Sequence, residues 1–364
     1  MTELEQEWIA AGIYDPATPD AAERLELLYW IAAHDVPTER MVQACAEGQL
    51  NSLVGDLSLR PGRRMTIAQV AAASGLSLEQ MLELRRSGGF PDVAPDAPVY
   101  VEADLAMFRT FKAANAFFST DELVHFNRVI GMSLRRIAEA ASEMFLRDVE
   151  APMLTESSEL DKAQANLSGI ELAHSATGLF DPMFRAHLEL STQMNRQARA
   201  GTHDYATVPL TIAFVDLNGF TARSGELAPD ALLQLVMAFE STATDLISER
   251  GGRMIKLIGD EVMFTTVDPI DACSIARSLI DRAGEWASNA RGGIAHGQVL
   301  ASGGDVYGEI VNLASRIADI AVPGELLVNE AVARSATTLA FEPAGRRLLK
   351  GFPQPIRLWA LQVV

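Results

Sequence analysis

The spacing of apolar residues changes near residue 197, and this change restricts the possible folds more than any other feature of the chain. Before it, apolar residues recur mostly at helical spacing. After it, short β-branched runs alternate with helical patterns. The polar stretch 197–206 has the composition of a linker. The sequence therefore predicts two domains, 1–196 and 207–364, joined by a linker at 197–206.

The N-terminal domain is predicted to be all-α. Ser77 and Ser119 are followed by the acidic or amide residues that are typical of helix starts. Glycine and proline at 88–91 and 95–98 separate helical segments. The expected helices are Ala21–Ala33, Met65–Ser74, Leu78–Arg86, Val101–Asn115, Thr120–Leu146 and Glu159–Arg199, the last of them broken.

The C-terminal domain is predicted to be α+β. Its element order begins β-α-β-β-α-β, which favours a ferredoxin-like sheet with helices on one face. The expected strands are Val208–Val215, Arg253–Ile258, Glu261–Val267, Gly292–Ala301, Glu325–Val328, Thr338–Phe341 and Ile356–Gln362. The expected helices are Pro229–Glu249, Asp271–Trp286 and Glu309–Ile320.

Composition excludes several classes of protein. The net charge of -18 over 364 residues disfavours a general binder of nucleic acid or anionic membranes. Cys45 and Cys273 lie too far apart for a disulfide framework or a cysteine zinc site. The acidic N-terminus lacks a signal-peptide profile, and no apolar run approaches the roughly 18 residues of a membrane span. We expect a cytoplasmic protein.

Two carboxylates stand at predicted strand ends. Asp216 follows the strand Val208–Val215, and Asp260 lies in the Gly-Asp turn of a predicted hairpin. Carboxylates on neighbouring strand ends can share divalent cations with a triphosphate, although either aspartate alone is also typical of an ordinary turn. Backbone N–H groups of a glycine-containing turn can bind phosphate. Such a turn follows the first aspartate and comprises Leu217, Asn218, Gly219, Phe220 and Thr221.

A third segment offers an amide and a guanidinium. Asn312 and Arg316 are four residues apart in a predicted helix, so they share one face. This pair suits a ribose and a charged phosphoryl group.

Together these segments resemble the catalytic domain of class III nucleotide cyclases, over about 207–364. The matching runs are Phe-Val-Asp-Leu-Asn-Gly-Phe-Thr at 214–221, Lys-Leu-Ile-Gly-Asp at 256–260, Arg-Gly-Gly-Ile-Ala-His-Gly at 291–297, Val-Asn-Leu-Ala-Ser-Arg at 311–316 and Leu-Lys-Gly at 349–351.

The resemblance implies roles for these residues. Asp216 and Asp260 would bind two divalent cations per active site, Mg²⁺ or Mn²⁺, with the Leu217 carbonyl as a further ligand. Asn312 would orient the ribose, and Arg316 would stabilise charge on the transferring phosphorus. A weaker assignment places Lys350 at the terminal phosphates, since its segment varies among such enzymes.

Lys256 and Asp305 stand where the cyclase pattern places its base-reading residues. A lysine only donates hydrogen bonds, and an ionised aspartate only accepts them. Adenine offers an acceptor at N1 and a donor at its amine, whereas guanine offers the reverse. This pair therefore favours adenine, because a buried mismatch is costly.

The implied reaction is attack of the ribose 3'-hydroxyl of ATP on the α-phosphorus, which gives 3',5'-cyclic AMP and pyrophosphate. In these cyclases the sites lie between two catalytic domains. This chain carries each element once, so the resemblance implies a homodimer. One chain would supply the metal carboxylates, and the other either Lys256 with Asp305 or Asn312 with Arg316. The family pattern favours placing all four of these residues on the other chain. The sequence identifies no general base.

Two other functions share part of this sequence pattern. A diguanylate cyclase shares the sheet, and Ile-Gly-Asp-Glu-Val at 258–262 superficially resembles its hairpin signature. Lys256 and the run at 311–316 do not belong to that family. A DNA-binding regulator is suggested by helix-turn-helix rhythm at 66–86, but the net charge makes DNA an unexpected partner. The arginines that flank this segment are Arg60, Arg63, Arg64, Arg85 and Arg86.

The helical half is expected to regulate catalysis, as in the actinobacterial two-domain soluble cyclases that this chain resembles. An ordinary dimerisation domain is the alternative. Movement of 159–199, which leads into the linker, would alter the dimer geometry. His174 and His187 permit a pH signal, and the apolar helices can hold a small molecule or lipid. The sequence does not choose among these signals.

Overall fold

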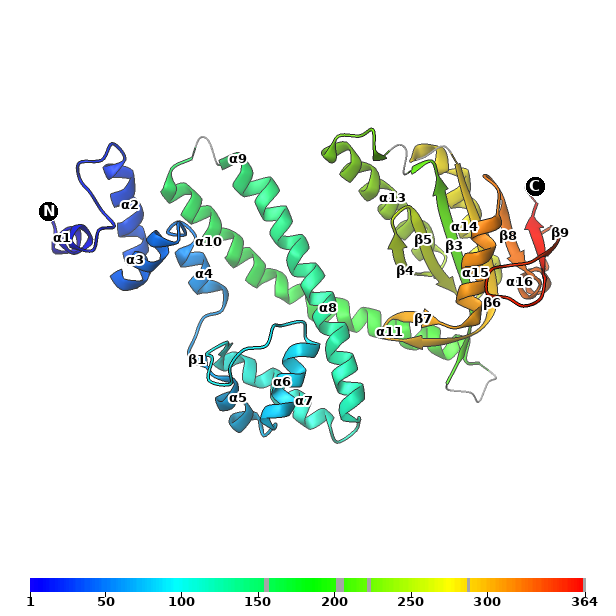
Figure 1. Ribbon diagram of the computed structural model, residues 1–364, viewed down its shortest axis with the longest axis horizontal. Coiled ribbons are helices and arrows are strands. Elements are labelled where there is room, and N and C mark those ends of the chain that lie inside the picture. Colours follow the sequence, from blue (N-terminus) through cyan, green and yellow to red (C-terminus); the bar gives the residue numbers. More distant parts are fainter. Residues whose placement is uncertain (154–156, 201–205, 221–223, 287–288, 363–364) are drawn as a thin grey trace. The chain divides into compact units, whose positions relative to one another are not determined.

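The structure, a computed structural model, describes residues 1–364 except 154–156, 201–205, 221–223, 287–288 and 363–364. The described chain falls into two units, Met1–Arg185 and Ala186–Val364, each with hydrophobic cores of its own (Figure 1). Helix α11 (Phe180–Ala198) contains the boundary. In the described part of the chain, no helix has the length and apolar character required to cross a membrane.

The first unit is helical, as predicted, with one exception. Strands β1 (Arg64–Met65) and β2 (Tyr100–Val101) form an antiparallel pair. The all-α prediction missed this pair because two-residue strands show no alternation of apolar and polar residues. The other helices of the unit are α1 (Glu3–Ala10), α2 (Ala21–Ala32), α3 (Thr38–Ala46), α4 (Leu53–Leu59), α5 (Ile67–Ser74), α6 (Leu78–Ser87), α7 (Leu105–Ala114), α8 (Thr120–Phe145), α9 (Ala151–Met153) and α10 (Glu159–Ala176).

Capping fixes where several of these helices begin. The side chains of Ser77 and Ser119 accept hydrogen bonds from the backbone N–H groups of Gln80 and Glu122. The Gln80 and Glu122 side chains accept hydrogen bonds from the N–H groups of the two serines in return. These capping boxes confirm the predicted starts of α6 and α8. Gly75 ends α5 at φ 74°, a conformation that glycine adopts at little cost.

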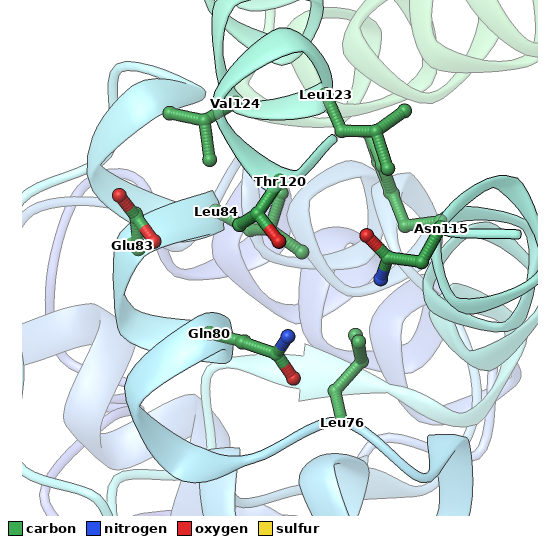
Figure 2. A pocket seen from close by; sticks show the side chains of 9 residues that line it. Leu76, Gln80, Glu83, Leu84, Asn115, Thr120, Leu123 and Val124 are labelled. Carbon is green, nitrogen blue, oxygen red and sulfur yellow. The ribbon is translucent and has the colours of Figure 1, made fainter. Parts of the chain in front are cut away.

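Two separate hydrophobic cores stabilise the first unit. One surrounds Trp8 and Ile31 and joins α1–α4 to Ala163 of α10. The other surrounds Ile67 and Phe108 and joins α5, α6 and α7. A cavity of about 20 Å³ lies between α6, α7 and the start of α8 (Figure 2). This cavity has room for about one water molecule, so it is not a ligand site.

The second unit is built on an eight-stranded sheet. Its strands are β3 (Val208–Asn218), β4 (Arg253–Ile258), β5 (Glu261–Thr266), β6 (Asn289–Ser302), β7 (Asp305–Tyr307), β8 (Leu326–Asn329), β9 (Phe341–Arg347) and β10 (Ile356–Leu361). Its helices beyond α11 include α13 (Pro229–Glu249), α14 (Pro269–Asp281), α15 (Glu309–Ile320) and α16 (Glu330–Ser335). The strand expected at Thr338–Phe341 lies later in the chain, as β9, where it pairs with β10.

The sheet order is β4-β5-β3-β6-β8-β10-β9, and β7 pairs with β6. Strands β3, β4, β5 and β6 are the four strands of the predicted β-α-β-β-α-β unit. Numbered by their order along the chain and read from β6, they stand in the sheet as fourth (β6), first (β3), third (β5) and second (β4). All their pairings are antiparallel. This arrangement confirms the ferredoxin-like prediction.

Helices cover both faces of the sheet, whereas the prediction placed them on one face. Helices α13 and α14 pack on one face around Phe239 and Phe264. Helix α15 packs on the other face, where Ala314 contacts a core that includes Phe214. The one-face prediction was wrong for α15 because this helix follows the β-α-β-β-α-β unit, whose order does not determine its face.

Gly293 on β6 allows α15 to lie close to the sheet. A Cβ atom at this position would come within 2.2 Å of the Ala318 backbone nitrogen and 2.5 Å of the Ala314 carbonyl oxygen. Backbone atoms in a packed helix cannot rotate away as a flexible side chain can. A larger residue at position 293 must therefore displace α15.

We predict that Gly293→Ala lowers the free energy of unfolding by about 1–3 kcal/mol, the usual cost of overpacking. Gly284→Ala is the matched control, because a Cβ there meets nothing within 4 Å. Urea denaturation of both full-length variants measures the difference. Equal stability of the two variants would contradict the close contact between α15 and β6.

Candidate active site

The register of β3 brings several charged side chains to one end of the sheet. Asp216 lies opposite Glu261 of β5 on one side and Arg291 of β6 on the other. The turn between β4 and β5 carries Asp260, whose carbonyl accepts a hydrogen bond from the Leu217 backbone N–H at 3.1 Å. The segments that bear the two predicted metal ligands, Asp216 and Asp260, are therefore neighbours.

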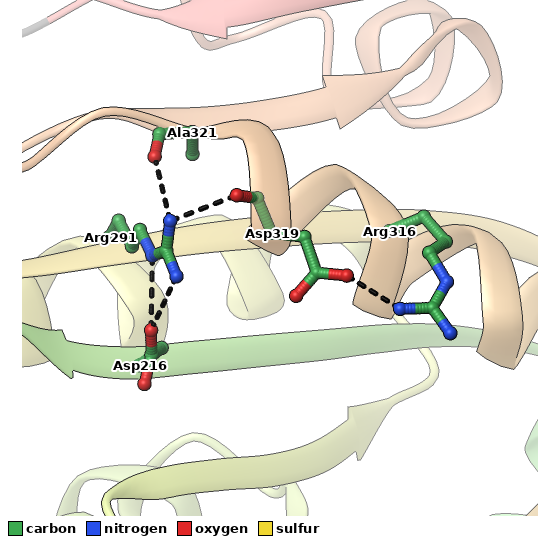
Figure 3. Close-up of polar contacts among 5 residues, drawn as sticks. All are labelled: Asp216, Arg291, Arg316, Asp319 and Ala321. Atoms are coloured by element: carbon green, nitrogen blue, oxygen red, sulfur yellow. Dashed lines mark hydrogen bonds and ion pairs between the residues drawn. The ribbon is translucent and has the colours of Figure 1, made fainter. Parts of the chain in front are cut away.

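Arg291 is the cation that binds Asp216. Its Nε and Nη2 atoms lie 3.0 and 2.9 Å from one Asp216 carboxylate oxygen (Figure 3). Its Nη1 donates to the carbonyls of Asp319 and Ala321, at 2.9 and 3.4 Å, at the end of α15. Sequence reasoning assigned Arg291 no role. The available signal was its position at the start of the matched run 291–297.

Negative charge is concentrated at this end of β3. Burial, together with the charges of Asp216, Asp319 and Asp260, raises the pKa of Glu261 to about 7. Burial also raises the pKa of Asp216, and the hydrogen bond and charge of Arg291 oppose that increase. A divalent cation placed here would favour the ionised forms of these carboxyl groups.

The donor set fits a hard divalent cation. Carboxylate, amide and backbone carbonyl oxygens are the ligands that such cations prefer. The Asn218 side-chain oxygen is buried and has no hydrogen-bond partner among the described residues. Within the same described part, no group of three or more His, Cys, Asp or Glu side chains is placed to hold a metal ion.

The turn after Asp216 contains the predicted phosphate-binding residues. Leu217 and Phe220 are buried in the core that surrounds Phe239 and Phe264. Gly219 has φ 85°, where a side chain would be strained. Thr221 lies outside the residues that the structure describes.

Asn312 and Arg316 lie on the face of α15 that points away from the core. Asn312 is exposed, whereas neighbouring Leu313 and Ala314 are buried. Arg316 binds Asp319, three residues further along the helix, at 2.6 Å (Figure 3). The predicted pair therefore shares a helix face that is accessible to another molecule.

Lys256 and Asp305 form an ion pair although they lie far apart in sequence. The Lys256 Nζ atom is 2.5 Å from a carboxylate oxygen of Asp305. The other carboxylate oxygen accepts a hydrogen bond from the Val306 backbone N–H at 2.8 Å. One side chain comes from β4 and the other from β7, so the two predicted base-reading residues meet.

The single chain leaves the predicted residues in separate groups. Among the described residues, no hydrogen bond or ion pair links Lys256, Asp305, Asn312 or Arg316 directly to either of the two aspartates predicted to bind metal. Lys350 is exposed in the turn between β9 and β10.

The first unit contains a larger cavity, of about 910 Å³. Helices α7 and α8 contribute apolar side chains to it, including Phe108 and Ile130. Asn127 is buried in its wall and donates to the Leu84 carbonyl at 2.7 Å. Its size and lining are those of a small-molecule pocket.

Most arginines near the helix-turn-helix-like segment have partners within the chain. Arg85 donates to the Pro91 carbonyl at 2.8 Å and is largely buried. The other pairs are Arg60 with Asp104, Arg63 with Glu102 and Arg86 with Asp92. These contacts disfavour a phosphate-binding surface.

Comparison with known proteins matches both halves of the chain. Residues 11–194 match the family described as adenylate cyclase regulatory domain. Residues 203–362 match the family described as adenylate and guanylate cyclase catalytic domain.

Individual proteins are similar over most of the chain. An uncharacterised protein of Mycobacterium tuberculosis is 33% identical over 97% of this chain and 92% of its own length. An adenylate cyclase of Streptomyces coelicolor is 31% identical over 79% of this chain and 76% of its own. A pH-sensitive adenylate cyclase of M. tuberculosis is 29% identical over 94% and 88%, respectively.

Among solved structures, the adenylyl cyclase CyaB of P. aeruginosa covers 43% of this chain and 94% of its own, with 23% identity and a TM-score of 0.40. From the family matches and the relatives, the chain belongs to the class III nucleotide cyclases, with an adenylate cyclase regulatory domain ahead of the catalytic domain.

Proposed function

We propose that this cyclase is an adenylate cyclase, which converts ATP to 3',5'-cyclic AMP and pyrophosphate at sites shared by two chains of a homodimer. The observation that carries the choice of ATP is the ion pair between Lys256 and Asp305. This pair offers one donor and one acceptor side by side, which complements N1 and the amine of adenine. Guanine would meet a donor with a donor.

Asp216 and Asp260 would hold two divalent cations, Mg²⁺ or Mn²⁺, with the Leu217 carbonyl as a further ligand. When bound, these cations lower the pKa of the ribose 3'-hydroxyl and neutralise phosphate charge. Both Arg291 contacts go to one Asp216 carboxylate oxygen, Oδ2, so the other oxygen would be available to a cation. The hydrogen bond and charge of Arg291 favour the ionised form of Asp216 that would bind the cation.

The other residues of the chain would position the triphosphate and the ribose. Backbone N–H groups of the turn that follows Leu217 would face the phosphates, because the Leu217 N–H itself already donates to the Asp260 carbonyl. Asn312 would orient the ribose, and Arg316 would exchange Asp319 for the α-phosphoryl group, where negative charge develops. Lys350 would contact the terminal phosphates.

A homodimer would bring these groups together. In one chain Asn312 is exposed and Arg316 is partly exposed on the free face of α15, so this face would be accessible to a second chain. Helix α13 carries exposed apolar side chains, Leu233, Val236 and Met237, that suit a protein interface. In a two-fold dimer each chain would supply the metal aspartates of one site and the four other residues of the second.

We propose that residues 1–196 regulate the catalytic domain 207–364 through the linker at 197–206. Helix α11 leads directly into this linker. The 910 Å³ cavity supports a small apolar molecule or lipid as the signal. Protonation of His174 or His187 is the alternative. His174 already contacts the Leu59 carbonyl at 3.1 Å.

We predict that the purified chain makes cyclic AMP from ATP only with Mg²⁺ or Mn²⁺, and that Asp260→Ala lowers the rate at least about a hundredfold. Loss of a positioned charge stabiliser has an effect of this size. Chromatographic detection of cyclic AMP measures both results. Asp245→Ala, at an exposed aspartate of α13, is the matched control. Near-normal activity of Asp260→Ala, or of the chelated enzyme, would contradict the metal site.

Base selectivity is predicted to reside in Lys256 and Asp305. The double variant Lys256→Glu, Asp305→Ser exchanges donor and acceptor, so the ratio of ATP to GTP turnover should fall at least about tenfold. Parallel assays with both nucleotides give this ratio. Arg250→Glu changes a nearby exposed charge outside the pair and should keep the ratio of the unmodified enzyme. An unchanged ratio in the double variant would show that these residues do not read the base.

A further inference from the structure

The second unit contains a cavity of about 230 Å³ that shares only Asp305 with the residues placed in the proposed reaction. It lies between the last turns of α11, the starts of β3 and β4, the end of β5, and the turn between β6 and β7. Its apolar wall includes Met194, Ala198 and Leu210, and its polar lining includes Asn195, Arg253, Thr265 and Asp305.

Arg253 supplies a cation to this cavity. Its neighbour Met254 packs against the core under α13 and α14. Because side chains alternate along a strand, Arg253 points to the opposite face of the sheet, toward the cavity. Arg253 has no hydrogen bond or ion pair with any other described residue. Burial lowers the pKa of its guanidinium, which the more distant charge of Asp305 only partly offsets. A half-buried arginine without a direct partner favours an anion beside it.

Thr265 supplies a hydroxyl group. It lies opposite Arg253 in the pairing of β4 with β5, and only 1% of its surface is exposed. Its Oγ1 atom is buried and has no hydrogen-bond partner among the described residues. A buried hydroxyl without a hydrogen-bond partner carries a cost in free energy. A ligand that accepts from this atom or donates to it would remove that cost.

Asp305 does not satisfy the Arg253 guanidinium or the Thr265 hydroxyl. Its carboxylate binds Lys256 and the Val306 backbone N–H, and among the described residues it makes no hydrogen bond or ion pair with Arg253 or Thr265. Arg253 and Thr265 are therefore available to one small anion, next to walls formed by Met194, Ala198 and Leu210.

We infer that this cavity binds a small monocarboxylate with a short apolar body. The carboxylate would accept hydrogen bonds from Arg253 and Thr265, and the body would contact the apolar wall. A volume of 230 Å³ lies below the roughly 300–1,000 Å³ of pockets for larger ligands, so a nucleotide does not fit. A phosphate dianion would leave one charge unbalanced beside Asp305, which disfavours it.

The test is isothermal titration of the full-length chain with sodium butyrate, with sodium phosphate and sodium chloride at equal ionic strength as comparisons. The unmodified chain should bind butyrate in preference to both. Arg253→Met and Thr265→Val should each weaken binding at least about tenfold, and Arg253→Lys should keep part of it. Arg250→Met removes an exposed arginine of the same region that does not line the cavity, so it should bind like the unmodified chain.

Unchanged butyrate affinity in both Arg253→Met and Thr265→Val would overturn the inference, since binding would then occur elsewhere. No binding to the unmodified chain, or a preference for phosphate, would also overturn it. Because Thr265→Val preserves shape, it keeps the test valid if Arg253→Met does not fold. The titration does not depend on cyclase activity, so its result is separate from that of the proposed function.

Discussion

The catalytic unit depends on how negative charge at the end of β3 is balanced. The antiparallel register places Asp216 between Glu261 and Arg291, with Asp260 in the adjacent turn. A shift of one residue would turn Asp216 to the other face of the sheet and separate it from this group. In the single chain, Arg291 is the cation that binds the carboxylate directly. In the proposed enzyme, divalent cations held by Asp216 and Asp260 would supply further positive charge there.

The catalytic unit also depends on close packing at Gly293. Because β6 has no side chain there, α15 lies against the sheet and fixes Asn312 and Arg316 on its free face. Arg291 connects the end of β3 with α15, since the same guanidinium that binds Asp216 also binds carbonyls at the end of α15. The strand end and the helix are therefore positioned by one network of contacts.

Much of this arrangement could be predicted from sequence, because it follows from local patterns. Capping serines gave the starts of α6 and α8, and the element order gave the ferredoxin-like core. Lys256 and Asp305, which the sequence predicts to read one base, form an ion pair, and their contact with a base stays a prediction. The contact between Arg291 and Asp216 could not be predicted, since it depends on strand register. The face covered by α15 and the short pair β1–β2 were missed for similar reasons: neither leaves a periodic signal.

A mixed dimer tests the shared site most directly. Asp216→Ala and Arg316→Ala chains, each inactive alone, are co-expressed with different tags, and the species that carries both tags is isolated. One of its two sites would contain Asp216 from one chain and Arg316 from the other, and the second site would lack both. The account predicts about half of the activity of the unmodified dimer if the sites act independently. Activity no higher than that of either parent would contradict a site built from two chains.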